Sequence, residues 1–167
     1  MARGRIIIYT TNDDLMPSLI RVGEKHGVGL TNPETGVITT LSVEEGAEGT
    51  QMPVDIDALS QAVVAGVTFQ FWLSKDADVI CEVRHLDAAI AWTFSLTGLR
   101  PDEVGTVTEW LLGAVAAAEG TAGLVLDRAG RGEDFDWDSL ITAGPANPSA
   151  YPADLVLTVP RQTPDAG

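Results

Sequence analysis

Cys81 and His85 are the two residues whose types suggest nucleophilic catalysis. They are four positions apart in an alternating, strand-like segment, so an extended chain separates them by about 13 Å. A nucleophile and its base must approach to about 3 Å. We therefore interpret Cys81 as a core thiol, whose apolar surroundings keep it unreactive, and His85 as structural. His26, near the end of an expected helix, favours a capping role.

Asp134, Asp136 and Asp138 alternate as the first ligands of a calcium loop do. The sixth position of such a loop is Ser139 instead of Gly, and the twelfth is Pro145 instead of Glu, so the pattern fails. A solvated acidic edge or a helix N-cap at Asp136 is the better interpretation. One cysteine and two distant histidines supply no zinc set. The sequence predicts no metal and no cofactor.

Other catalytic patterns are missing from the sequence. Residues 128–133 (Arg-Ala-Gly-Arg-Gly-Glu) lack both the Lys-Ser/Thr of a P-loop and the spacing of a dinucleotide fingerprint. There is no GxSxG elbow and no HExxH motif. Nothing selects a catalytic pair among the 24 carboxylates. The sequence leaves an enzyme open but favours a protein without catalysis.

Three alternating segments within residues 67–97 predict an antiparallel β-meander with one apolar face. Pairing Leu73 with Val79, and Leu86 with Ala89, keeps like faces together. The expected cross-strand rows are Phe71–Cys81–Phe94, Phe69–Val83–Trp92 and Val67–His85–Ile90.

A long helix is predicted over residues 101–119, with Pro101 in its first turn and Gly120 as its stop. Its length of about 27 Å matches the roughly 25 Å of a meander strand. We expect it to pack along the apolar face of the meander, with a further strand at 123–127 returning beside it.

The other expected elements give one α+β domain over residues 1–159, in which an N-terminal β-α-β-hairpin segment extends the same sheet. They are a strand at 5–10, a helix from Leu15 to Gly27, a hairpin of 28–30 with 37–41, a surface loop at 44–53, a helix at 57–65, a helical turn in 135–141, an edge strand at 154–159 and a disordered tail at 160–167.

The composition limits which classes of partner the protein can be expected to bind. A net charge of −14 makes nucleic acids and anionic membranes poor partners; it suits a basic protein, or serves solubility alone. Abundant Ala, Gly and Asp, with Arg in place of Lys, suggest a high-GC bacterial genome. A single cysteine fits a reducing cytoplasm. No apolar run approaches the ~20 residues of a membrane span, so we expect a soluble cytoplasmic protein.

The second face of the meander is the candidate site. Its expected rows are Gln70–Glu82–Thr93 and Trp72–Ile80–Ser95. Either the 57–65 or the 15–26 helix covers them, or they form the apolar centre of a binding patch. The candidate partner-binding residues are Trp72, Ile80, Glu82, Thr93, Asp134, Asp136 and Asp138.

Two further expectations concern the acidic side chains. The acids of segments 44–57 and 133–138 should converge on one side if the charge serves recognition. Neutralising the three aspartates of 134–138 should then slow association and leave stability nearly unchanged.

Two function classes remain. The first is a non-enzymatic acidic module that binds a basic protein, in the manner of immunity or antitoxin proteins; homo-oligomers stay open. The alternative is a small-molecule binder or enzyme with a pocket between sheet and helices, lined by Trp92, Trp110 or Trp137.

Overall fold

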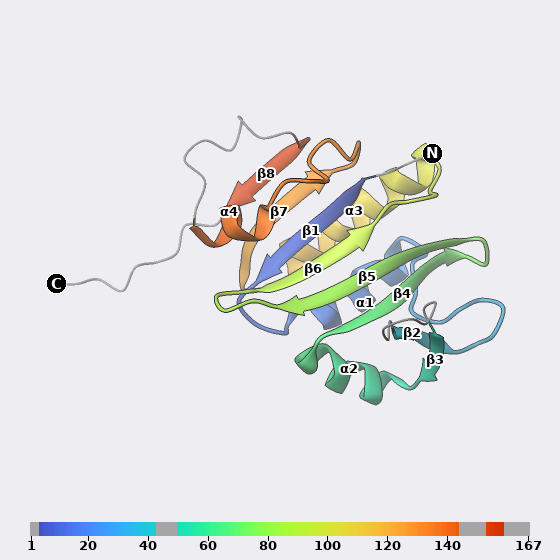
Figure 1. The fold of residues 1–167 in the computed structure, drawn as a ribbon. Coiled ribbons are helices and arrows are strands. Elements are labelled where there is room, and N and C mark those ends of the chain that lie inside the picture. Colours follow the sequence, from blue (N-terminus) through green and yellow to red (C-terminus); the bar gives the residue numbers. More distant parts are fainter. Residues whose placement is uncertain (1–3, 43–49, 144–152, 159–167) are drawn as a thin grey trace.

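A computed structural model describes residues 4–42, 50–143 and 153–158. These residues form one antiparallel eight-stranded sheet, in the order β3-β2-β4-β5-β6-β1-β7-β8 (Figure 1). The predicted α+β fold is confirmed. The strands are β1 (Arg5–Thr10), β2 (Ile38–Ser42), β3 (Thr50–Val54), β4 (Val67–Ser74), β5 (Ala77–His85), β6 (Ile90–Ser95), β7 (Thr121–Asp127) and β8 (Leu155–Thr158). The helices are α1 (Leu15–Lys25), α2 (Ile56–Ala65), α3 (Pro101–Ala117) and α4 (Trp137–Ala143).

The N-terminal strand β1 lies inside the sheet, between β6 and β7. Ile6 and Ile8 belong to the core on one face, and Ile7 and Tyr9 to the core on the other. A strand buried on both faces has no polar side to show, which explains its unbroken apolar run. The segment predicted at 123–127 therefore joins the sheet through β1, and does not pair with the meander directly.

The larger core lies between the first face of the sheet and helices α1, α2 and α3. Trp110 of α3 is fully buried, and its ring stands edge-on to Phe71 and Phe94 at centroid distances of 4.7 and 5.7 Å. Its indole N–H donates to the carbonyl of Leu19 in α1 at 2.9 Å. The predicted packing of the long helix on the apolar face of the meander is confirmed.

The smaller core lies on the second face, under α4 (Figure 1). Trp137 and Ile141, one helical turn apart, pack there against Ile7 and Tyr9. The expectation that the 57–65 or the 15–26 helix covers this face is wrong. Both helices carry their apolar stripes to the first face.

The predicted meander is present, but the register predicted between β4 and β5 is wrong. Cys81 lies opposite Phe94 and Val83 opposite Trp92, as predicted. Phe71, however, pairs with Val79 instead of Cys81, because the chain turns at Lys75 and Asp76 and β5 begins at Ala77. The displacement is two residues, so every side chain keeps its face.

The N-terminal hairpin is also corrected. In place of the expected ladder between 28–30 and 37–41, the structure has one bridge between Thr31 and Ile38, and Gly29 bonds to the backbone of Trp72 in β4. Strand β2 pairs instead with β4 and with β3, whose first four residues, 50–53, were predicted as loop. The rest of that loop and the predicted tail at 160–167 lie outside the described residues.

Candidate functional site

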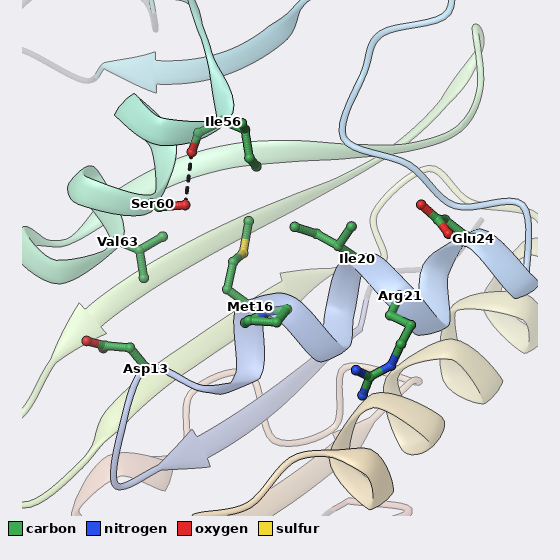
Figure 2. A pocket seen from close by; sticks show the side chains of 9 residues that line it. Asp13, Met16, Ile20, Arg21, Glu24, Ile56, Ser60 and Val63 are labelled. Atoms are coloured by element: carbon green, nitrogen blue, oxygen red, sulfur yellow. Dashed lines mark hydrogen bonds between the residues drawn. The ribbon is translucent and has the colours of Figure 1, made fainter.

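A groove of about 490 Å³ runs between α1 and α2. Figure 2 shows Met16 and Ile20 of α1 rising toward Ile56 and Val63 of α2. The ends of the groove carry Asp13 and Glu24, and its remaining lining residues are Pro17, Arg21 and Ser60. It is an apolar channel with charged ends.

Sequence pattern explains why these side chains meet. In α1, Leu15, Leu19 and Val22 face the main core, and Met16 is buried at its edge. Ile20, partly buried, follows Met16 by one helical turn on the neighbouring side of the helix. In α2, Leu59 and Val63 make the corresponding contact with the core.

Helix α2 is fixed at both ends. The carboxylate of Asp55 accepts from the backbone N–H of Ala58 at 2.7 Å, an N-cap. Near the other end, Nε2 of His85 lies 2.8 Å from the carbonyl of Val63. His85 therefore has a structural partner. The groove keeps an apolar rim because Ile56 remains 42% exposed.

A second group of polar residues lies on the opposite face of the sheet, where α4 begins. The guanidinium of Arg84 donates twice to the carboxylate of Asp138, at 2.5 and 3.1 Å, and its Nε lies 3.1 Å from Glu82. The hydroxyl of Tyr9 donates to the same carboxylate at 2.7 Å. Asp138 thus binds α4 to β5 and β1 at once.

The electrostatics of this group follow from its contacts. Burial alone would raise the pKa of Asp138, but hydrogen bonds from Arg84 and Tyr9 outweigh it and hold the pKa below its usual value. The hydrogen bond to Asp138 raises the pKa of Arg84. Burial and the neighbouring Asp138 raise the pKa of Tyr9. The pair stays ionised, and the phenol stays protonated, across the neutral range.

A pocket of about 250 Å³ opens beside this group. It brings together four of the seven predicted site residues: Glu82 and Thr93, which face each other across β5 and β6, and Asp136 and Asp138. Its other lining residues are Arg5, Ile7, Arg84, Phe135 and Trp137. Asp136 is the N-cap of α4, as one interpretation of the sequence held, and accepts from the N–H and hydroxyl of Ser139.

The other three predicted site residues lie outside this pocket. Trp72 and Ile80 are diagonal neighbours on β4 and β5, displaced by the register error from the row expected for them. Trp72 is half-buried and Ile80 is 39% exposed. Asp134 is exposed.

Two further expectations concern Cys81 and the three tryptophans. Cys81 is fully buried, and burial followed by the charge of Glu82 raises the pKa of its thiol. Of the three tryptophans proposed as pocket walls, Trp92 and Trp110 are fully buried, and Trp137 lines the pocket at α4. Helices α2 and α4 lie at separate ends of the sheet (Figure 1), so Asp55 and Asp57 do not approach the 134–138 acids.

Sequence reasoning missed the cationic half of the pocket and the whole groove. Arg5 and Arg84, the two cationic residues of the pocket, were given no role from the sequence, although alternation placed Arg84 on the face of Glu82. The groove depends on how α1 and α2 lie against each other, which periodicity does not give.

The chain matches no protein-family model, no curated protein and no solved structure. Within the described residues, no helix is both long and apolar enough to cross a membrane.

Proposed function

We propose that this protein is a non-enzymatic acidic module that binds a basic partner protein, and that the α1–α2 groove receives an amphipathic helix of that partner. The observation that carries the proposal is an apolar channel between two helices, ended by carboxylates, on a chain of net charge −14. Amphipathic helices dock in such grooves by apolar residues spaced i, i+3/i+4 and i+7. Immunity and antitoxin proteins illustrate this kind of acidic partner.

The apolar part of the groove matches one face of a helix. Ile56 is 42% exposed, and Ile20 is partly buried beside it. Covering such surface releases about 25 cal/mol per Å². Met16 lies at the centre of the groove, where it is 5% exposed, belongs to the main core and forms part of the apolar floor.

The charged ends set the length and polarity of the partner helix. Glu24 is nine positions after Leu15, the first residue of α1, which corresponds to about 14 Å along the helix, and Asp13 lies two residues before Leu15. Arg21 points to the side of α1 away from Ile56 (Figure 2). A helix of about 12 residues with Lys or Arg near each end would place its cations against both carboxylates.

The test uses a labelled helical peptide of this design, with leucines at i, i+4 and i+7 and lysines at both ends. Binding is measured by fluorescence anisotropy. Ile56→Ser should weaken it at least about tenfold, because a polar side chain there interrupts the apolar channel. Val64→Ser is the matched control: Val64 is on the same helix and 60% exposed, but does not line the groove.

A second part of the experiment tests whether binding requires opposite charges on the peptide and the groove. A peptide with glutamates in place of lysines should not bind, and Glu24→Gln should weaken the lysine peptide more than Glu34→Gln, an exposed acid in a distant turn. Equal effects of the two serine variants, or equal binding of the acidic peptide, would overturn the proposal.

A further inference from the structure

The pocket at α4 lies on the face of the sheet opposite the groove, so a ligand bound there would be independent of the proposed function. Its walls come from β1, β5 and β6 and from the segment that opens α4. Five of its nine lining residues are ionisable: the arginines Arg5 and Arg84 and the acids Glu82, Asp136 and Asp138. Its volume of about 250 Å³ lies below the 300–1,000 Å³ usual for drug-sized ligands.

Most polar atoms of the pocket already have partners. Arg84 uses its guanidinium on Asp138 and Glu82. One terminal nitrogen of Arg5 donates to the backbone carbonyls of Gly132 and Glu133, at 3.4 and 3.2 Å. These bonds hold both guanidinium groups in place.

Two atoms differ. Nε of Arg5 and Oγ1 of Thr93 are buried, and among the described residues neither has a hydrogen-bond partner. Both residues line the pocket, and both project from the second face of the sheet, since Ile7 lies opposite Thr93 and two positions after Arg5. A buried donor without an acceptor is costly, and more so on a cation. An acceptor oxygen from a ligand would satisfy both atoms.

We propose that this pocket binds a small zwitterion of amino-acid size. Its carboxylate accepts from Nε of Arg5 and the hydroxyl of Thr93, and its ammonium group faces Glu82 and Asp136. The partly buried ring of Phe135, which packs on the buried Trp137 at a centroid distance of 4.6 Å, adds a further surface for a cation.

The charge of the pocket selects this class. Three carboxylates stand against two guanidinium groups, so the ligand-free lining carries a net charge of −1 when all five groups are ionised. A phosphate dianion would gain Arg5 but meet Glu82 and Asp136. A simple amine would leave the two orphaned donors unsatisfied. A molecule with both charges satisfies the two unpaired donors and also offers a cation to the excess carboxylate charge.

The first experiment measures the melting temperature (Tm) of the full chain with each protein amino acid at about 10 mM. For each amino acid that binds, the N-acetyl derivative lacks the ammonium charge and the decarboxylated amine lacks the carboxylate. At about ten times its Kd, the amino acid should raise Tm by about 3–6 °C, and the two derivatives should not. No shift with any amino acid, an equal shift with either derivative, or a larger shift with inorganic phosphate would overturn the proposal.

The second experiment separates binding from folding. Thr93→Val keeps a β-branched residue in β6 and removes only the orphaned hydroxyl, so Tm without ligand should stay equal or rise. The ligand-induced shift should fall at least about fivefold, since one of two carboxylate donors is lost. Thr68→Val, on β4 and outside the pocket, should leave that shift unchanged. Equal shifts in the two variants would contradict the assignment, and so would a fall in Tm of unliganded Thr93→Val, because the hydroxyl would then have an internal partner.

Discussion

Asp138 is the side chain on which the second face of the molecule depends. Its carboxylate receives Arg84 from β5 and Tyr9 from β1, residues that are 54 and 129 positions away in the chain. Charge-assisted bonds of this kind contribute about 1.5–3 kcal/mol each. These contacts argue against the expectation that neutralising the three aspartates of 134–138 leaves stability nearly unchanged.

The lowered pKa of Asp138 makes its contribution to stability depend on pH. Since the pKa is lowered in the folded chain, the contribution is present above the unfolded value of about 3.9 and is lost as pH falls through the folded value. Asp138→Asn should destabilise the protein by about 1–3 kcal/mol at pH 7 and by much less at pH 2.

Urea titration at the two pH values measures this difference. Asp134→Asn is the control, because Asp134 is exposed and should change stability by less than about 0.5 kcal/mol at either pH. A loss with Asp138→Asn that is equal at both pH values would show that the carboxylate is not ionised in its contact with Arg84.

At this scale the sequence predicts faces better than partners. Alternation was enough to place Glu82 opposite Thr93 on β5 and β6, which the structure confirms. It was not enough to join Asp138 to Tyr9, because that contact depends on β1 lying inside the sheet. The periodicity of a sequence does not determine which distant strand becomes a neighbour in the sheet.

The long helix α3 illustrates the element scale. It packs closely on α1, and two of its glycines meet different surroundings. A Cβ added at Gly113 would lie 2.9 Å from Cγ1 of Val22, whereas one added at Gly105 meets nothing within 4 Å. Gly113 therefore serves the close approach of two helices, and Gly105 has no such role.

Replacing each glycine by alanine should separate these roles. Gly105→Ala should stabilise the protein by about 0.5–1 kcal/mol, the difference in helix propensity. Gly113→Ala should gain less or lose stability, because Val22 must move. Thermal unfolding of the two variants makes the comparison, and an equal gain in both would show that α1 and α3 are not in close contact at Gly113.

The elements themselves were largely predictable, and their order was not. Period-two alternation identified β4, β5 and β6, and Pro101 and Gly120 bounded α3 closely. The error in the β4–β5 register came from assigning four residues to a turn that uses Lys75 and Asp76. The same alternation fits both registers, since they differ by two.

On the scale of the whole molecule, the sheet separates two surfaces of different character. Helices α1, α2 and α3 cover one face and leave an apolar groove with acidic ends, while α4 covers part of the other and leaves a small polar pocket. The net charge of −14 acts on both. It favours encounter with a basic partner, and it disfavours anions at the pocket.

The salt dependence of association tests this charge effect. The rate constant for binding of the lysine peptide should fall steeply between low salt and about 0.5 M, because exposed charges are screened within about 10 Å at 0.1 M. The dissociation rate should change less. Stopped-flow fluorescence separates the two, and an association rate that ignores salt would mean that charge plays no part in recognition.

The most direct measurement of the docking surface is residue-resolved NMR of the full chain during titration with the lysine peptide. We expect amide shifts to concentrate in α1 and α2, around Met16, Ile20 and Ile56, with β7 and α4 unaffected. Shifts confined to the α4 face, or spread evenly over the exposed acids, would contradict the assignment of the groove as the docking surface.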